Sequence, residues 1–208
     1  MREITPGIFH WTTLHEPIGA RVSSYLVPAA GIVIDPKVPG EGLDALPEKP
    51  QQVVLTTGLH DRDAQQFAEA FDIPIRAPRE ALSRLGDTLE VTTFGDGDEV
   101  APGVTAIHIG KLADDEYALH LAVGAGAIAF ADGLNRYGES LAFFSDDLLG
   151  DDPQGVKRGL KQAFEGLLVR EFDTLLFAHG EPLAVGGKAA LRDFVTSPAG
   201  EEDFGQSA

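Results

Sequence analysis

The chain has 208 residues, no cysteine and a formal net charge of −17 at pH 7. This length suits one domain with a sizeable core. Without cysteine there is no disulfide and no thiolate-bound metal, so any metal ligand must be His, Asp or Glu. The negative charge would repel nucleic-acid phosphates and anionic lipid head groups, so we expect neither as a partner. The chain shows no basic leader followed by an apolar run, and no apolar stretch of about 18 residues, which favours a cytoplasmic location.

Short apolar runs, interrupted by Gly, Pro and charged residues, predict strands in the first quarter of the chain. These strands cover Ile8–Thr12, Val22–Val27, Gly31–Asp35 and Gln52–Thr56. Apolar residues at helical spacing then predict a helix, a strand and a second helix that starts at a proline. These elements cover Arg62–Phe71, Ile73–Arg76 and Pro78–Gly86.

The middle of the chain is rich in strands with glycine-containing turns between them, a pattern typical of antiparallel hairpins. These strands cover Leu89–Thr93, Val104–Ile109, Tyr117–Val123 and Ala127–Ala131. An apolar stripe with spacings of three and four predicts a long helix after them, followed by a buried strand and a last helix. These elements cover Pro153–Val169, Asp173–Ala178 and Gly187–Val195.

This order of elements predicts an α/β fold in which two sheets pack face to face with helices outside. No linker or repeat divides the chain, so we expect a single domain over residues 1–195 and a flexible acidic tail over 196–208.

Polar side chains follow three of the predicted apolar strands, where catalytic groups are commonly found. His60 and Asp61 come after the first, Asp132 after the second and His179 after the third. The remaining histidines have no nearby chemical partner in the sequence, and we interpret them as structural. They are His10, His15, His108 and His120.

The order of these segments resembles the metallo-β-lactamase superfamily. Ser23–Val27 followed by Gly31–Asp35 is similar to the N-terminal hairpin of that family, and Gly95–Asp98 through His108–Gly110 is similar to the hairpin that leads to one of its metal ligands. The resemblance implies a four-layer αββα sandwich of two mixed β-sheets with outer helices.

The family signature Thr-His-x-His-x-Asp-His matches this chain without a gap from Thr56. This alignment puts Thr57, Leu59, Asp61 and Arg62 at the four ligand positions, Lys111 at the next, and Asp132 and His179 at the last two. A register shifted by two instead matches Asp63 to the motif aspartate and puts Asp61 at a histidine position. Both registers remain open at this stage.

The substitutions suggest a degenerate metal site in which Arg62 and Lys111 pair with Asp61 and Asp132 and so replace zinc. On this first hypothesis the protein has no cofactor, and its acidic chain binds a small molecule or a protein partner, or forms a homo-oligomer. Its cleft is lined by His60, Asp61, Arg62, Lys111, Asp132 and His179.

The second hypothesis is a hydrolase with one Zn, Mn or Fe ion held by Asp61, Asp132 and His179, the ligands that the resemblance retains. The candidates for catalysis are His60, Asp61 and Asp63. A third possibility is a purely structural module, which the sequence does not exclude.

Overall fold

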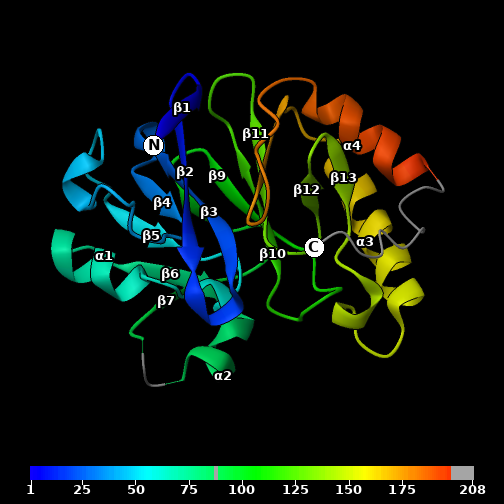
Figure 1. The fold of residues 1–208 in the computed structure, drawn as a ribbon, viewed down its shortest axis with the longest axis horizontal. Helices are drawn as coiled ribbons and strands as arrows, with labels where there is room; N and C mark the ends of the chain where they lie inside the picture. The colour runs from blue at the N-terminus through cyan, green and yellow to red at the C-terminus, as the bar shows by residue number, and fades with distance from the viewer. Residues whose placement is uncertain (87–88, 198–208) are drawn as a thin grey trace.

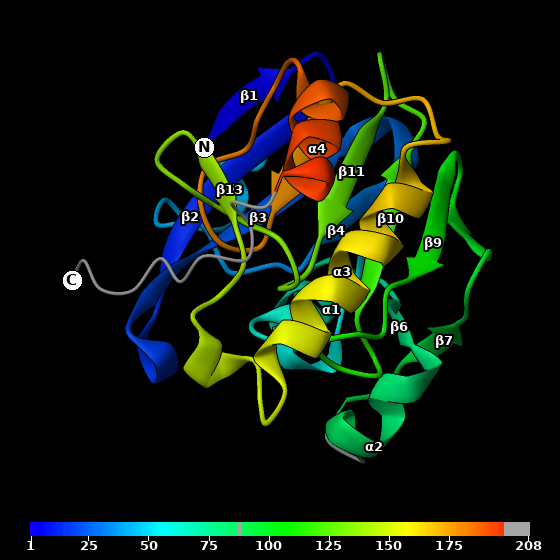
Figure 2. The same ribbon diagram turned by 90° about the vertical axis from the view of Figure 1, so that its right-hand side faces the viewer.

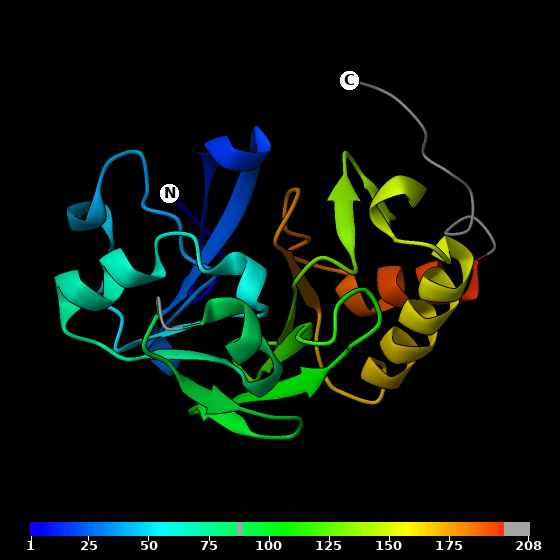
Figure 3. The same cartoon turned by 90° about the horizontal axis from the view of Figure 1, so that it is seen from below.

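The computed structural model describes residues 1–86 and 89–197, which form four layers. Two sheets pack face to face, with helices against the outer face of each (Figure 1). The same order is visible from below, where α1 and the helices α3 and α4 lie at opposite ends of the layered stack (Figure 3). The predicted αββα sandwich is therefore confirmed. Among the described residues, no helix is both long and apolar enough to cross a membrane.

The first sheet is mixed and contains seven strands in the order of the chain. They are β1 (Arg2–Thr5), β2 (Ile8–His15), β3 (Ala20–Val27), β4 (Ile32–Ile34), β5 (Gln52–Val54), β6 (Ile75–Pro78) and β7 (Thr92–Phe94). Strands β1 to β4 pair antiparallel, and β4 to β7 pair parallel. The prediction that the strand beginning at Leu89 belongs to an antiparallel hairpin is wrong, because β7 pairs parallel with β6.

The second sheet is also mixed and has the order β14-β11-β10-β9-β8. Its strands are β8 (Glu99–Ala101), β9 (Val104–His108), β10 (Tyr117–Leu121), β11 (Ala127–Phe130) and β14 (Thr174–Phe177). Only β11 and β14 pair parallel. A separate hairpin, β12 (Asn135–Tyr137) and β13 (Ser140–Ala142), follows β11.

Helices cover the two outer faces because each presents an apolar stripe to its sheet. The helices α1 (Ala64–Phe71) and α2 (Leu82–Leu85) pack on the first sheet. The helices α3 (Pro153–Leu167) and α4 (Gly187–Thr196) cover the second sheet, and Figure 2 shows both lying across β10 and β11. Residues 198–208, which make up most of the predicted acidic tail, lie outside the described residues.

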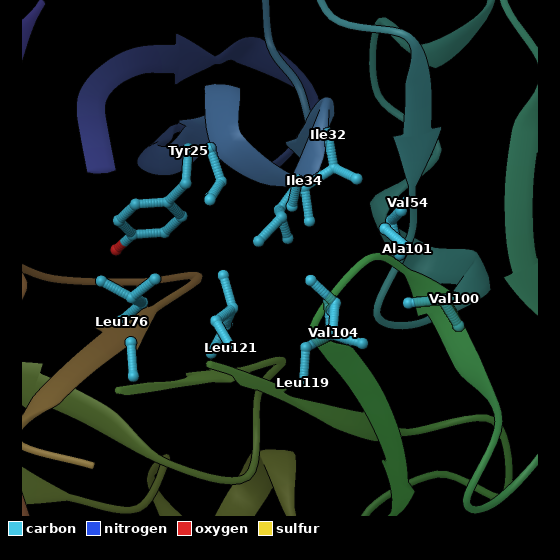
Figure 4. Close-up of a cluster of buried hydrophobic side chains, with 14 of the residues drawn as sticks. Tyr25, Ile32, Ile34, Val54, Val100, Ala101, Val104, Leu119, Leu121 and Leu176 are labelled. Carbon is cyan, nitrogen blue, oxygen red and sulfur yellow. The ribbon is translucent and has the colours of Figure 1, made fainter. Parts of the chain in front are cut away.

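The core between the sheets consists of aliphatic side chains that meet from both inner faces (Figure 4). Ile32 and Ile34 point from β4 toward Leu119 and Leu121 of β10, and all four are fully buried or nearly so. Tyr25 closes the cluster at the β14 side, where its hydroxyl donates to the carbonyl of Phe177 and accepts from the amide of the same residue. This core fixes the sheets against each other and therefore fixes the strand ends that carry the polar groups.

Two parallel strand pairs bring the candidate residues to one edge of the sandwich. Asp35 and Thr56 lie just after β4 and β5, and Asp132 and His179 lie just after β11 and β14. Parallel strands present their carboxyl ends at the same edge, which is where polar sites form in sheets of this kind.

Candidate metal-binding site

Three side chains at this edge place one ligand atom each within 4.8 Å of one another. They are His60, Asp132 and His179, which we call the His-Asp-His cluster. His60 is almost fully buried, and the side chains of Asp132 and His179 are each 15% exposed. The cluster is therefore a nearly enclosed group of polar atoms at the edge of the core.

A short 3-10 turn, η4 (Gly58–His60), aims His60 into the cluster. The hydroxyl of Thr57 accepts from the amide of Leu59 at the start of the turn. Buried Asp115 accepts two further hydrogen bonds, from the Thr57 hydroxyl at 3.0 Å and the Gly58 amide at 2.8 Å. These bonds occupy the free donors of the turn and hold its direction.

Asp35 fixes the orientation of the His60 ring. Its Oδ2 lies 2.9 Å from His60 Nδ1, while its two oxygens also accept from the amide and the hydroxyl of Thr56. Because a carboxylate only accepts, Nδ1 carries the proton and Nε2 is directed at Asp132. Asp35 reaches this position through a left-handed backbone conformation with φ of 45°.

Asp132 Oδ1 faces both imidazole rings at ion-pair distance. It lies 3.2 Å from His60 Nε2 and 3.4 Å from His179 Nε2, yet neither contact has hydrogen-bond geometry, and this buried oxygen has no other partner in the described chain. Bonds of about 2.0–2.1 Å to a tetrahedral ion would set neighbouring ligand atoms about 3.3–3.4 Å apart. Both contacts to Asp132 therefore fit shared coordination of one ion.

The electrostatics of the cluster favour a positive charge at its centre. Burial disfavours the charged form of His60, but Asp132 and Asp35 outweigh burial and raise its pKa to about 9. Burial also opposes the charge of Asp132, but the two histidines reverse that effect and hold its pKa below the usual range. Without a metal, the site therefore binds a proton on His60, and a metal ion would replace that proton.

His179 is positioned by its neighbours on both sides. The ring of Phe144 meets it edge-on at 5.5 Å between centroids. The following Gly180 has φ of 95° and lies so close to the backbone of Arg136 that an added Cβ would be 1.9 Å from its carbonyl oxygen. Only glycine fits at this approach, so the direction of the chain after His179 depends on it.

Arg62 lies beside the cluster and links three segments of the chain. Its Nη1 donates to the carbonyls of Ser23 and Asp35, each at 2.8 Å, while its buried Nη2 has no partner among the described residues. Burial lowers the pKa of this guanidinium, and the nearby Asp35 and Asp132 counteract that effect. Arg62 therefore brings positive charge close to the cluster without forming an ion pair with Asp132.

Glu116 borders the cluster on the side of β10. Its Oε1 accepts from the amide of Gly133 at 2.6 Å, next to Asp132. Burial and the neighbouring Asp132 raise its pKa to about 7. With Thr57 and Asp132 it lines a cavity of about 20 Å³, enough for one water molecule.

The structure brings together His60, Asp132 and His179, with His60 at the position that the sequence alignment gave to Asp61. Asp61 is exposed and its Oδ1 accepts from the amide of Arg62. Asp63 is also outside the cluster, because its carboxylate holds Lys37 Nζ and the amide of Val38, each at 2.7 Å. Neither register of the sequence motif therefore places an aspartate from this loop among the clustered ligand atoms.

Lys111 does not reach Asp132. It is exposed, its side chain lies along Gly159 of α3, and no ion pair joins it to Asp132 in residues 1–86 and 89–197. The predicted pairing of Lys111 with Asp132 and Asp61 is therefore absent. The physical reason is that the chain turns outward after β9, and the adjacent Leu112 and Ala113 line the small cavity instead.

Sequence reasoning missed Asp35 and Glu116. Asp35 follows the apolar run Ile32–Ile34 in the same way that His179 follows β14, so the search for polar residues after buried strands would have found it. Glu116 precedes β10 rather than following a strand, and nothing in its sequence surroundings distinguishes it from an exposed acid.

Solved structures with the same architecture are metallo-β-lactamases and related proteins, although neither a family model nor a curated protein sequence matches the chain. TTHA1623 in a di-iron-bound form is 20% identical, with a TM-score of 0.65 over 91% of this chain and 99% of that one. A metallo-β-lactamase from Hirschia baltica is 12% identical, with a TM-score of 0.63 over 93% of this chain and 94% of that one.

A third similar structure is a variant of the metallo-β-lactamase with the HARLDQ motif from Cronobacter sakazakii, in which an arginine, a glutamine and a lysine are each changed to histidine. It is 16% identical, with a TM-score of 0.58 over 85% of this chain and 79% of that one. At these identities the likeness concerns the fold alone. The chain has the metallo-β-lactamase fold, as the sequence predicts.

Proposed function

We propose that the protein is a hydrolase that works with one divalent transition metal, held by His60 Nε2, Asp132 Oδ1 and His179 Nε2. The observation that carries this proposal is the buried Asp132 Oδ1, which lies 3.2 and 3.4 Å from two imidazole nitrogens without a hydrogen bond to either. Two imidazoles and one carboxylate suit zinc, manganese or iron and leave coordination positions open.

Such an ion, when bound, supplies an activated water and polarises a substrate carbonyl or phosphoryl group. The protein side chains provide orientation and electrostatics. Asp35 holds the Nδ1 proton of His60 so that Nε2 remains a ligand, which is the role of outer carboxylates in metal sites. The cavity beside Glu116 and Asp132 has room for one water molecule.

This proposal differs from the first hypothesis drawn from the sequence, because His60 supplies the imidazole that the gap-free alignment lacked. A metal-free binding protein remains the second candidate. The specific observation in its favour is Arg62, whose guanidinium adds a positive charge near the cluster that a metal-binding site does not require. In that case the His60 imidazolium would replace the metal and the cleft would bind a small molecule or a protein partner.

The deciding experiment measures metal content and chelator sensitivity. We expect protein purified without chelator, or reconstituted with Zn²⁺, Mn²⁺ or Fe²⁺, to hold one ion per chain, and chelator to lower its melting temperature. His179→Ala should abolish stoichiometric binding. His120→Ala is the matched control, because His120 lies on β10 with its Nε2 bonded to the carbonyl of Glu171, away from the cluster.

A chain that holds no ion either as purified or after reconstitution with any of the three metals, with a melting temperature insensitive to chelator, would contradict the metal site and favour the metal-free candidate. If an ion binds, hydrolysis of ester, thioester and lactam substrates by the loaded protein tests the catalytic part. The His179→Ala protein, treated with the same metal in the same way, then serves as the blank for adventitious hydrolysis.

A further inference from the structure

A second pocket, of about 380 Å³, lies at the edge of the first sheet where β1 begins its pairing with β2. The charged or polar side chains of its lining are Arg2, His10, Thr12, Arg21, Glu41 and Glu181. None of the three clustered ligands lines it, and its volume falls within the range of about 300–1,000 Å³ typical of small-molecule sites. We call it the edge pocket.

His10 provides a hydrogen-bond acceptor in the edge pocket. Its Nε2 lies 3.0 Å from the hydroxyl of Ser23, and that hydroxyl donates its one proton to the carbonyl of Gly180. His10 Nε2 must therefore carry a proton and donate to Ser23, which leaves Nδ1 with a lone pair. No group in residues 1–86 and 89–197 hydrogen-bonds to Nδ1.

His10 also remains neutral at physiological pH. Burial lowers its pKa to about 4, and the ring is stacked on Tyr25 at 5.0 Å between centroids. The lone pair on Nδ1 is therefore held in place for an N–H or O–H donor from outside the chain.

Arg21 provides the cation for a ligand carboxylate. Its Nε and Nη2 donate to Thr12, and no carboxylate in the described parts of the chain lies within ion-pair distance of it. Because no carboxylate neutralises it among the described residues, the Arg21 guanidinium can pair with an external anion. Its Nη1 is not engaged in these bonds.

Glu181 provides the complementary negative charge. Its Oε2 pairs with Arg2, which leaves Oε1 available, and its charge acts on the His10 ring against the opposing charges of Arg2 and the N-terminal ammonium. The edge pocket thus combines an unpaired guanidinium with an imidazole acceptor that stands in the field of a carboxylate.

We propose that the edge pocket binds a free amino acid, whose carboxylate pairs with Arg21 and whose ammonium group donates to His10 Nδ1 and Glu181. A hydroxy acid shares the carboxylate and the donor but lacks the positive charge, so Glu181 favours the amino acid. This site is separate from the His-Asp-His cluster and does not depend on the function proposed for it.

Isothermal titration of the full chain with glycine, L-serine and L-glutamine tests the proposal, with L-lactate and acetate as comparison ligands. We expect saturable one-site binding of at least one amino acid and weaker binding of lactate and acetate. Arg21→Ala should weaken the affinity for the amino acid about 10-fold or more, because it removes a charge-assisted hydrogen bond to the ligand carboxylate. Arg158→Ala, an exposed arginine on α3 outside the pocket, should leave the affinity unchanged.

Glu181→Gln separates the two kinds of ligand, because it removes the charge that favours an ammonium group while keeping a similar shape. We expect it to weaken amino-acid binding and leave lactate binding unchanged. The proposal is overturned if no amino acid binds, if Arg21→Ala binds amino acids as well as the wild type, or if lactate binds more tightly than every amino acid. Circular dichroism and melting temperature check that each variant is folded.

Discussion

Asp35 Oδ2 and His60 Nδ1, both buried, lie 2.9 Å apart, and this contact determines which ring nitrogen of His60 faces Asp132. The contact joins the end of β4 to the turn after β5. The parallel pairing of β4 with β5 therefore fixes the orientation of the His60 ring and the direction of its Nε2 atom.

Asp35→Asn should weaken metal binding by about 10- to 100-fold, the range typical of outer-shell changes. An asparagine that turns its NH₂ group toward His60 Nδ1 would move the ring proton to Nε2 and so remove the ligand lone pair. Asparagine tolerates the left-handed backbone at this position, so the fold should persist. Competition titration with Zn²⁺ or Co²⁺ measures the change.

Asp63→Asn is the matched control. Asp63 lies close to His60 in the chain, but its carboxylate binds Lys37 Nζ and the amide of Val38 rather than the cluster. Its metal affinity should stay within about 3-fold of the wild type, although its stability can fall. Equal losses of metal affinity in the two variants would contradict the orienting role of Asp35.

The metal-free protein should lose stability as pH rises from about 6.5 to about 9. The folded-state pKa of His60 is raised to about 9 from 6.5, so its stabilising contribution is fully present below 6.5 and disappears as pH passes 9. A shift of this size corresponds to about 3 kcal/mol at most. Urea unfolding of chelator-treated protein at several pH values measures the slope.

His60→Gln should remove that part of the pH dependence while also lowering stability at pH 6. A wild-type slope that persists unchanged in His60→Gln would assign the effect to another group. Adding Zn²⁺ to the wild type should flatten the slope as well, because bound metal replaces the proton on His60.

The sequence predicted the fold well because its core strands are rich in apolar residues. Val22–Val27 and Tyr117–Val123 show this clearly, since their buried faces leave little room for other assignments. Strand β1 escaped prediction because it is short, polar and largely exposed at the sheet edge. Strands β8, β12 and β13 have three residues each, too few to show a periodicity.

The site could be predicted only in part because a linear motif does not describe how a loop turns. The sequence prediction included Asp132 and His179, which lie two residues after the parallel strands β11 and β14. In the first loop, the 3-10 turn over Gly58–His60 rotates His60 inward and leaves Asp61 exposed. A gap-free alignment assumes the residue spacing of another loop and so pointed to Asp61, whereas the side chain that joins the cluster is the neighbouring His60.

Gly180→Ala should disturb His179 through a clash rather than through backbone strain alone. An alanine Cβ would lie 1.9 Å from the carbonyl oxygen of Arg136, whereas at Gly138, which also has positive φ, a Cβ would meet nothing within 4 Å. We expect Gly138→Ala to cost about 1 kcal/mol of unfolding free energy and Gly180→Ala about 3 kcal/mol or more.

Only Gly180→Ala should also reduce metal affinity, because His179 is the preceding residue. Denaturant unfolding and metal titration of both variants measure the two effects. Similar losses in both variants would show that the close approach to Arg136 is easily relieved.

Arg62→Met should separate stability from metal binding, because we expect the two to change in opposite directions. The guanidinium donates to the carbonyls of Ser23 and Asp35, so its removal deletes one hydrogen bond to each carbonyl and should cost about 2 kcal/mol of unfolding free energy. The same change removes a positive charge near the cluster and should tighten divalent metal binding by about 5-fold.

Lys111→Met is the control, because it removes an equal charge from an exposed position. It should change the unfolding free energy by no more than about 0.5 kcal/mol and have little effect on metal affinity. Urea unfolding of the metal-free proteins and competition titration with Zn²⁺ provide the two readouts. If Lys111→Met instead costs as much stability as Arg62→Met, the lysine is buried in solution and forms an ion pair there, which contradicts its exposed position. If Arg62→Met instead weakens metal binding, the guanidinium stabilises the arrangement of the three ligand side chains, and this effect outweighs its repulsion of the ion.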